Sequence, residues 1–455
     1  MRHHCTKLKD QDLANLGRYR PHGMKPDVAK HRFDLGVEWL DSLARRRWHD
    51  GLGRMKRLVE MLDLQDYVWG MQKPKYVHIA GTNGKGSVTC MVKQLLIEHG
   101  LKTGAAFSPY VDDFRERVQF GPQPLPYEDF LVPLAELAAA DEKLNDSPFE
   151  GASAFELKTA LGFQVWKRLG AEAVALEVGM GGRLDASNVV DPSSCVIVSI
   201  GWDHKDVLGD TLGKIAAEKA GIIKSGRPLL LGWVPDEAEE VILARARAMK
   251  APVWQLGKDI QISSNGEGFD LKMPGVEMND LKTRLYGEIQ KGNAALAVAA
   301  VHQSGIELQA EKVRKALIEA TLPGRFEELD WNGVLVVLDG AHNLPAAENL
   351  ADNLLQRTPG KKRGLLLSML QGHDAAEFLD PLKGVFDCAV AVTGTSPRGR
   401  QAAELLPALR GIGLNAECHP DRPEALQALR SQGVEVICAT GSFYGLTLVR
   451  DFVSQ

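Results

Sequence analysis

Short apolar runs alternate with amphipathic segments from about residue 75 to the C-terminus. The runs have the length of strands and are rich in Val, Ile, Leu and Ala, as expected for strands buried on both faces of a parallel sheet. Their alternation with helices is typical of βαβ units. The predicted strands are 76–80, 173–178, 195–200 and 229–232 in a first series, and 334–338, 365–369, 388–392 and 434–439 in a second.

The second series begins after Leu322-Pro323-Gly324-Arg325, where a Pro-Gly pair marks a hinge or linker. A helical pattern starts near Val37, and the polar segment before it, rich in Arg, His and Lys, predicts a poorly ordered extension. We therefore expect an extension (1–35), an α/β domain (36–322), a linker (323–325) and a second α/β domain (326–455). The other predicted helices are 212–223, 311–320, 345–356 and 424–430.

The composition is that of an ordinary globular chain, with 44% hydrophobic and 25% charged residues. The 54 Lys and Arg residues against 59 Asp and Glu give a net charge of −5, which argues against a nucleic-acid partner. No apolar run predicts a secretory signal or a membrane span, so we expect a cytoplasmic protein without a membrane partner. The six cysteines lie far apart and predict neither disulfides nor a zinc site.

A glycine-rich loop joins the first strand to a helix. The segment 76–80 runs into Gly81-Thr82-Asn83-Gly84-Lys85-Gly86-Ser87, and apolar residues then recur at helical spacing. Such a loop lets backbone N–H groups converge on phosphate oxygens, while Lys85 neutralises charge and the Ser87 hydroxyl can ligate Mg²⁺. The spacing departs from the common Walker motif because Gly86 stands between Lys85 and Ser87. A merely structural glycine turn is the alternative.

This loop resembles that of the folylpolyglutamate synthase/dihydrofolate synthase family, a branch of the Mur ligase superfamily. Other motifs of the family match in the same order over almost the whole chain from about Leu35. They are Ser108-Pro109, 114–118, Phe155-Glu156, 159–161, 176–188, 200–204, Leu208-Gly209, 218–222, 322–325 and 338–343. The resemblance implies an N-terminal P-loop ATPase domain with a mostly parallel sheet and a smaller, Rossmann-like C-terminal α/β domain.

The resemblance also implies ligands for metal ions. Glu177 lies at the end of one predicted strand and His204 follows the next one, so both lie at the edge of the sheet where open α/β proteins bind ligands. By similarity to the family, two Mg²⁺ ions would be held by Ser87, Ser108, Glu177 and His204. Lys219 would be carbamylated and orient the second ion, and a monovalent cation is a further candidate. Without the resemblance, the alternative for His204 is a hydrogen-bonded loop histidine, and the alternative for Lys219 is a position on a solvated helix face.

The predicted ATP-binding residues are Gly81, Thr82, Asn83, Gly84, Lys85, Gly86, Ser87, Gln290, Asn293, Arg325, Asp339 and His342. Of these, Arg325 lies on the linker, where domain closure would bring it to the γ-phosphate. By similarity to the family, Phe155, Arg183 and Asp185 are the predicted substrate-binding residues, and a carboxylate suits the N–H donors of a pterin edge. The alternatives are a surface ion pair for Arg325 and a turn cap for Asp185.

The implied activity is an ATP-dependent amide ligase that joins L-glutamate to dihydropteroate or to the glutamate tail of a reduced folate. Its catalytic residues would be Lys85, Lys219, His204 and Arg325, and the protein would act as a monomer on small molecules. Tyr110 and Ile289 stand where the family commonly has His, and the pair Asp112-Asp113 is unusual. A Mur-type ligase for another substrate and a P-loop nucleotide-binding protein without ligase activity are the alternatives.

Overall fold

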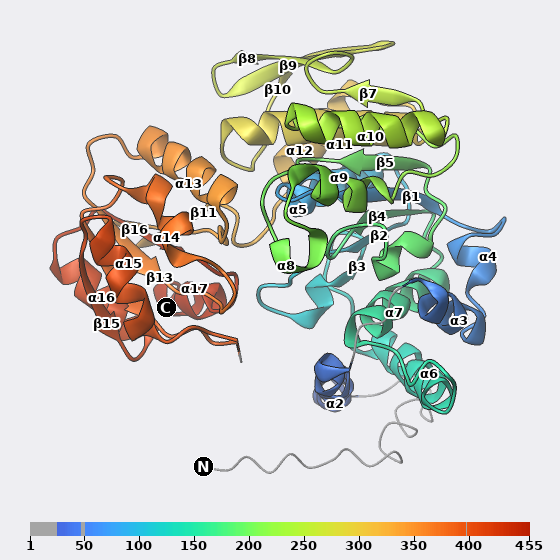
Figure 1. The fold of residues 1–455 in the computed structure, drawn as a ribbon, viewed down its shortest axis with the longest axis horizontal. Coiled ribbons are helices and arrows are strands. Elements are labelled where there is room, and N and C mark those ends of the chain that lie inside the picture. The colour runs from blue at the N-terminus through green and yellow to red at the C-terminus, as the bar shows by residue number, and fades with distance from the viewer. Residues whose placement is uncertain (1–24, 47–50, 397) are drawn as a thin grey trace.

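The structure, a computed structural model, describes residues 25–46, 51–396 and 398–455. Its first sheet has seven strands in the order β3-β2-β4-β1-β5-β6-β7, and every pair is parallel except β2 with β3 (Figure 1). The strands are β1 (Lys75–Ala80), β2 (Thr103–Ala106), β3 (Val118–Phe120), β4 (Ala173–Glu177), β5 (Ser194–Ile197), β6 (Leu229–Leu231) and β7 (Val253–Gln255).

Helices cover both faces of this sheet, which explains why β1 and β4 are buried at almost every position. Val77 and Ile79 face one core, which also contains apolar residues of α5, α11 and α12. Tyr76 on the alternate face packs with α2, α3, α6 and α7, and α9 and α10 cover the far end of that face. The bounds are α2 (Pro26–Ser42), α3 (Gly53–Met61), α4 (Gln65–Val68), α5 (Lys85–Glu98), α6 (Glu128–Asn145), α7 (Ala154–Leu169), α8 (Lys205–Leu208), α9 (Leu212–Ala220), α10 (Asp236–Ala248), α11 (Glu288–Gln303) and α12 (Ala310–Glu319).

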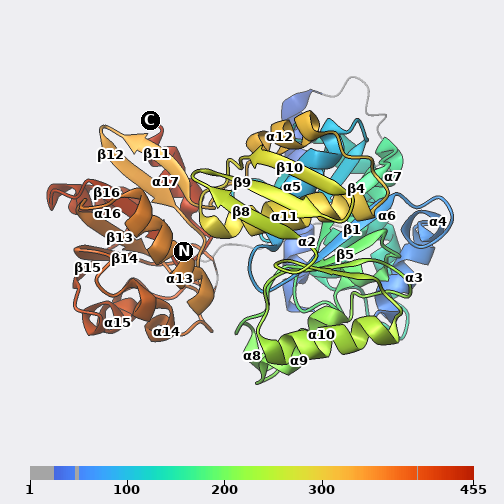
Figure 2. The same cartoon turned by 90° about the horizontal axis from the view of Figure 1, so that it is seen from above.

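A small antiparallel sheet lies over α11 and was absent from the sequence prediction (Figure 2). Its strands are β8 (Gln261–Asn265), β9 (Gly268–Met273) and β10 (Val276–Leu281). Phe269, Leu271 and Met273 of β9 are buried and alternate with more exposed polar residues. That alternation, with glycines at both turns, is the signal that could have predicted it.

The second sheet has six strands in the order β11-β12-β16-β13-β14-β15, parallel except for the hairpin of β11 and β12. Its strands are β11 (Glu327–Trp331), β12 (Val334–Leu338), β13 (Arg363–Leu367), β14 (Cys388–Val392), β15 (Asn415–His419) and β16 (Val436–Thr440). Its helices are α13 (Leu344–Arg357), α14 (Ala375–Leu379), α15 (Leu406–Gly411), α16 (Arg422–Ser431) and α17 (Leu446–Val453). The predicted mixed α/β fold with mostly parallel sheets is confirmed.

The helix α2 begins earlier than the sequence pattern suggested. Pro26 occupies its first turn, where proline is favoured, and the helix already buries Phe33. The Phe33 ring lies 5.1 Å from that of Phe130, so this helix is anchored in the core of the first α/β unit. Residues 26–35 are therefore helical rather than part of an extension, and residues 1–24 lie outside the described ranges.

Candidate active site

The phosphate loop turns sharply between β1 and α5, as predicted. Gly84 has a φ of +82° and directly precedes the helix. A Cβ atom at this position would lie 2.8 Å from Cγ1 of Val198, so the close approach also requires glycine. The first N–H groups of α5 have no partner within the helix, and together with the helix dipole they favour an anion. The turn can therefore hold phosphate.

Two groups of hydrogen bonds fix the loop. The Lys85 ammonium donates to the carbonyl oxygens of Gly81 (3.0 Å) and Thr82 (3.1 Å), so it lies across the loop. The Asn83 N–H donates to the Ser199 hydroxyl (3.0 Å), which follows β5. The loop is thus supported by its own lysine and by the neighbouring strand.

Asn343 of the second α/β unit also contacts the loop. Its side-chain oxygen accepts a hydrogen bond from the Asn83 amide (3.1 Å), and its own amide donates back to the Asn83 oxygen (3.2 Å). The same Asn343 oxygen accepts from the N–H of Ala346 and so caps α13 (3.1 Å). The N-terminus of a second helix is thereby brought beside the phosphate loop.

A cavity of about 130 Å³ opens beside the loop. It brings together predicted ATP-binding residues from both α/β units, namely Thr82, Asn83, Gly84, Ser87, Gln290, Asn293, Arg325 and Asp339. The amide of Asn293 donates to the Gln290 oxygen (2.9 Å), which fixes both side chains. His342 does not line this cavity, because its ring packs against His373 and its Nδ1 lies 2.8 Å from the Gly340 oxygen.

Arg325 lies between the acidic groups of the two α/β units. Its guanidinium stacks on the Phe443 ring at 4.4 Å, and Asp339 and Glu177 both favour its charged form. Asp339 accepts hydrogen bonds from the N–H groups of Phe326 (2.9 Å) and Ala341 (2.8 Å). Burial raises the pKa of Asp339, and Arg325 provides the largest opposing influence.

Glu177 ends β4 and reaches the first turn of α5. The residue is 6% exposed, and its Oε2 accepts a hydrogen bond from the N–H of Ser108 (2.9 Å). A Cβ atom on Gly86 would lie 3.9 Å from each carboxylate oxygen. Burial raises the pKa of Glu177, and the charge of Lys85 is the main influence in the other direction. This carboxylate offers the hard oxygen donors that Mg²⁺ prefers.

His204, another predicted metal ligand, lies elsewhere. Its side chain is 44% exposed, and its Nε2 is 3.7 Å from Oδ1 of Asp203. It lines neither of the two cavities that Glu177 borders. Within the described ranges, no group of three or more His, Cys, Asp or Glu residues is arranged to hold a metal ion. The structure thus brings Ser108 and Glu177 together, whereas Ser87 lines the nucleotide cavity and His204 lies apart.

Lys219 is buried in α9, with 3% of its surface exposed. Its ammonium donates to the Gly81 carbonyl oxygen (3.1 Å), so it contacts the start of the phosphate loop. The pKa of Lys219 is lowered to about 7, mainly by burial and secondly by repulsion from Lys85. The alternative of a solvated helix face is excluded for this residue, and burial shifts its amine toward the neutral form.

Asp185 and Phe155 lie close to each other, and Phe155 lines a pocket together with Glu177. Asp185 accepts hydrogen bonds from the N–H groups of Met180 (3.0 Å) and Ser187 (2.9 Å), so it does cap a turn. Arg117, which the sequence analysis did not single out, stacks on the Phe155 ring at 4.9 Å and is attracted by Asp185. A carboxylate, an aromatic ring and a guanidinium therefore converge in one place.

Arg183 lies outside this group. Its side chain is 55% exposed and binds Glu218 through two hydrogen bonds of 3.0 and 2.8 Å. The structure therefore places it in a surface ion pair, away from Asp185.

The unusual residues after Ser108 have structural partners. The Tyr110 ring packs against Phe114 at 5.8 Å, and burial raises its pKa to about 12. Asp113 caps the short helix that follows it. Asp112 accepts hydrogen bonds from Thr447 and Arg450, both on α17. The loop that follows Ser108 is thus tied to the second α/β unit. Ile289, the other departure, lines the nucleotide cavity and is 40% exposed.

A phosphate loop on a parallel sheet, joined to a second α/β unit that contributes to the nucleotide cavity, defines a Mur-type ligase. The chain matches the Mur ligase middle domain over residues 133–301 and the Mur ligase glutamate ligase domain over residues 324–443. It belongs to the dihydrofolate synthase/folylpolyglutamate synthase family. The enzyme of this name from Bacillus subtilis is 31% identical over 422 residues, which cover 90% of this chain and 97% of that one.

Solved structures agree with this assignment. The Escherichia coli FolC complex with DHPP and ADP has a TM-score of 0.83 and 29% identity, and the match covers 92% of this chain and 97% of that one. A bifunctional folylpolyglutamate synthase/dihydrofolate synthase with Mn, AMPPNP and L-glutamate bound has a TM-score of 0.81 and 31% identity, over 92% and 98% of the two chains. The chain is therefore an ATP-dependent carbon–nitrogen ligase. None of the helices in the described ranges is long and apolar enough to cross a membrane.

Proposed function

We propose that this ligase joins the amino group of L-glutamate to the carboxyl group of dihydropteroate or of a reduced folate. The observation that carries the proposal is the position of Glu177. It lies beside the phosphate turn and also borders the pocket of Phe155, in the neighbourhood of Asp185. An acceptor carboxylate near Glu177 and Ser108 would therefore meet the terminal phosphate of ATP.

In the first step, the acceptor carboxylate attacks the γ-phosphorus, and ADP leaves with the formation of an acyl phosphate. Lys85 lies across the loop and balances charge on the transferred group. Arg325 supplies a second positive charge from the predicted linker (323–325), and we propose that its contact with the γ-phosphate depends on domain closure. The glutamate amine then attacks the acyl carbon, phosphate leaves, and the amide forms.

The oxygen donors of Ser108 and Glu177 fit Mg²⁺, and Ser87 and His204 belong to the proposed ligands by resemblance, although His204 lies apart from Glu177 in this structure. When bound, Mg²⁺ would neutralise phosphate charge and so lower the barrier to transfer. Ser108 also acts through its backbone, since its N–H group orients the Glu177 carboxylate.

We further propose that Lys219 carries a carbamate in the active enzyme. Carbamylation requires a neutral amine, which attacks CO₂ to form N–COO⁻ and releases a proton. The lowered pKa of Lys219 supports this step, because burial supplies the neutral amine near pH 7. The resulting anion would remove the unfavourable proximity of two ammonium groups, Lys219 and Lys85.

We propose dihydropteroate as an acceptor that is recognised by Asp185 and Phe155. A buried carboxylate such as Asp185 can accept hydrogen bonds from the N–H donors of a pterin edge, and an aromatic ring can stack on the bicyclic system. Arg117 adds a cation above Phe155. These groups would orient the ring while the benzoate end of the substrate extends toward Glu177.

The decisive experiment measures phosphate release with ATP and Mg²⁺, using 7,8-dihydropteroate or tetrahydrofolate, each with and without L-glutamate. Product masses are recorded in every reaction. Release that requires both glutamate and an acceptor, with a mass gain of a single glutamate, supports the proposal and identifies the acceptor. Release that is independent of both would refute it in favour of a nucleotide-hydrolysing protein, and a different mass gain would indicate another amino acid.

A further inference from the structure

A chain of buried polar side chains connects the centre of the first sheet with Asp185. It begins at His78 in β1, whose side chain is fully buried. Nε2 of His78 lies 2.9 Å from the Ser187 hydroxyl oxygen, and that oxygen lies 2.5 Å from Oδ1 of Asp185. Ser187 and Asp185 are buried as well. None of the proposed reaction steps uses the imidazole of His78.

The imidazole of His78 is neutral. Burial lowers its pKa to about 3, and the charge of Lys224 adds to this effect. A neutral imidazole carries one N–H group, on either Nδ1 or Nε2. Nδ1 is buried and has no hydrogen-bond partner among the described residues. Because buried N–H groups rarely lack an acceptor, the proton belongs on Nε2, where it is donated to Ser187.

The position of this proton sets the direction of the other hydrogen bonds. The Ser187 oxygen accepts from His78, so the Ser187 hydroxyl donates its own proton to Asp185. Oδ1 of Asp185 also accepts from the N–H of Ser187 (2.9 Å), and Oδ2 accepts from the N–H of Met180 (3.0 Å). These three donors stabilise the carboxylate and oppose the rise in the pKa of Asp185 that burial causes.

One acceptor position of the Asp185 carboxylate is left for a ligand. A carboxylate has about four lone-pair positions, which the two oxygens share equally. The two donors of Ser187 use both positions of Oδ1, and Met180 uses one position of Oδ2. Oδ2 and the Phe155 ring both lie next to Gly179, because a Cβ atom there would lie 3.2 Å from Oδ2 and 2.3 Å from Cζ of Phe155. The free position is therefore on the oxygen that lies near the aromatic ring.

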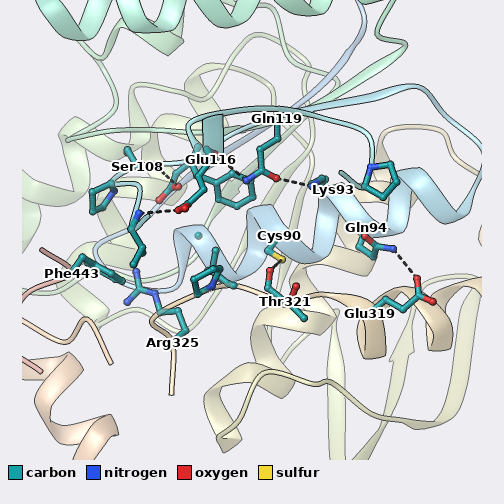
Figure 3. A pocket seen from close by; sticks show the side chains of 18 residues that line it. Cys90, Lys93, Gln94, Ser108, Glu116, Gln119, Glu319, Thr321, Arg325 and Phe443 are labelled. Carbon is teal, nitrogen blue, oxygen red and sulfur yellow. Dashed lines mark hydrogen bonds between the residues drawn. The ribbon is translucent and has the colours of Figure 1, made fainter. Parts of the chain in front are cut away.

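The space on the other side of Glu177 is less suited to an aromatic ring. This cavity of about 250 Å³ shares Phe107, Ser108 and Glu177 with the pocket of Phe155. Figure 3 shows that polar and charged side chains make up much of its lining, among them Lys93, Gln94, Glu116, Gln119, Glu319 and Arg325. We therefore expect a pterin ring on the side of Phe155, where the carboxylate held by Ser187 can bind it.

We propose that His78 is a positioning residue for the acceptor. Its N–H group turns the Ser187 hydroxyl toward Asp185, which holds Asp185 as a carboxylate whose free lone pair accepts from a pterin N–H. The inference rests on the proposed function, because it requires dihydropteroate to bind at Asp185. It adds a residue that acts on the substrate without touching it, and it gives a role to the imidazole in the middle of a buried strand.

His78→Leu tests this role, since leucine removes the donor and keeps an apolar side chain in the core. We expect the KM for 7,8-dihydropteroate to rise about 3- to 10-fold, as for the loss of one hydrogen bond. The KM values for ATP and L-glutamate, and kcat, stay within about twofold. His78→Gln supplies an N–H donor near the place of Nε2, so the KM for dihydropteroate returns to within about twofold of the wild type.

A double-mutant cycle distinguishes positioning from a general effect on packing. Ser187→Ala interrupts the chain between His78 and Asp185. In that background His78→Leu should therefore cause no further rise in the KM for dihydropteroate, because residues that act through one network are not additive. Circular dichroism and thermal unfolding establish that each variant is folded. His78→Asn, whose amide is too short to reach Ser187, takes the place of His78→Leu if the leucine variant is unfolded.

Tyr76→Phe is the matched control. Tyr76 lies two residues before His78, so its side chain is on the same face of β1. Its hydroxyl donates to the Tyr67 carbonyl oxygen (3.2 Å), a hydrogen bond that does not lead to Asp185. Tyr76→Phe therefore removes a buried hydrogen bond from the same strand and should leave the KM values for ATP, L-glutamate and dihydropteroate unchanged.

The tautomer of His78 can be observed directly. In NMR spectra of the enzyme labelled with nitrogen-15 in histidine, the signal of His78 is assigned by its loss in His78→Gln. Near neutral pH we expect a proton on Nε2 and none on Nδ1. A proton on Nδ1 overturns the inference, because the hydrogen bonds would then run from a neutral Asp185 carboxyl through Ser187 to His78.

Kinetic results can overturn the inference while leaving the ligase intact. An unchanged KM for dihydropteroate in the folded His78→Leu protein does so, as does an equal rise in all three KM values or an additive effect with Ser187→Ala. An enzyme that ligates tetrahydrofolate but not dihydropteroate overturns it too. If the wild-type enzyme shows no glutamate-dependent phosphate release, the proposed function itself has failed, and with it the inference.

Discussion

Lys219→Met is predicted to make the protein more stable while removing its activity. The pKa of Lys219 is about 7 in the folded protein against 10.5 for an ordinary lysine. Between these two pH values the unfolded chain binds more protons, so the lysine disfavours folding and stability rises with pH. Methionine has no charge to withdraw from water and avoids this cost.

The magnitude follows from the two pKa values. Proton linkage gives an upper limit of about 4 kcal/mol for the cost at pH 7 and about 2 kcal/mol at pH 9. The free energy of unfolding of Lys219→Met should therefore exceed that of the wild type, and the difference should shrink by about half between these pH values.

Urea unfolding at pH 7 and pH 9 measures the difference, in CO₂-depleted buffer without nucleotide so that Lys219 is unmodified. Lys214→Met on the same helix is the matched control. Lys214 is exposed and paired with Asp210 at 2.7 Å, so its replacement should change stability by less than about 1 kcal/mol at either pH. A Lys219→Met protein that is less stable than the wild type, or a difference that grows with pH, would refute the reasoning.

Three other substitutions test the site. Lys85→Ala should lower kcat by about 10²- to 10³-fold with an unchanged far-UV spectrum, because it removes a charge beside the transferred phosphate, and a kcat within about twofold of the wild type would contradict this role. Asp185→Asn should raise the KM for dihydropteroate in steady-state assays and spare activity with tetrahydrofolate; equal losses with both acceptors would indicate a purely structural role for the cap. Asp112→Ala should increase the radius of gyration in solution scattering, because the bridge to Thr447 and Arg450 is lost. Asp113→Ala, which affects only the local cap, should leave the radius of gyration unchanged.

The sequence predicted the centre of each sheet better than its edges. Strand β1 and the loop after it combine an apolar run, glycines and a helical repeat, all of which are local signals. The edge strands β7 and β15 are three and five residues long and partly exposed, so they lack a continuous apolar run. The start of α2 was missed because its first turns are polar on the exposed side and bury only a few residues, such as Phe33.

In the candidate site, too, only features set by local sequence could be predicted. Residues of the phosphate loop could be predicted because their spacing in the chain sets their geometry. Arg117 and His78 could not, since each depends on partners far away in sequence, such as Phe155 and Ser187. Conversely, the sequence could not show that Arg183 turns toward Glu218 at the surface, because only the packing of α9 decides this.

The short connection between the two sheets has a consequence for when ATP can be hydrolysed. Gly324 is bound to the second sheet, because its N–H donates to Glu327 (2.8 Å) and its oxygen accepts from Gly340 (2.9 Å). Thr321, by contrast, is held to α5 through the Cys90 thiol (3.0 Å). Any pivot must therefore lie between them, and Arg325 travels with the second sheet. An open enzyme would hold ATP without this guanidinium, which guards against futile hydrolysis before the other reactants have bound.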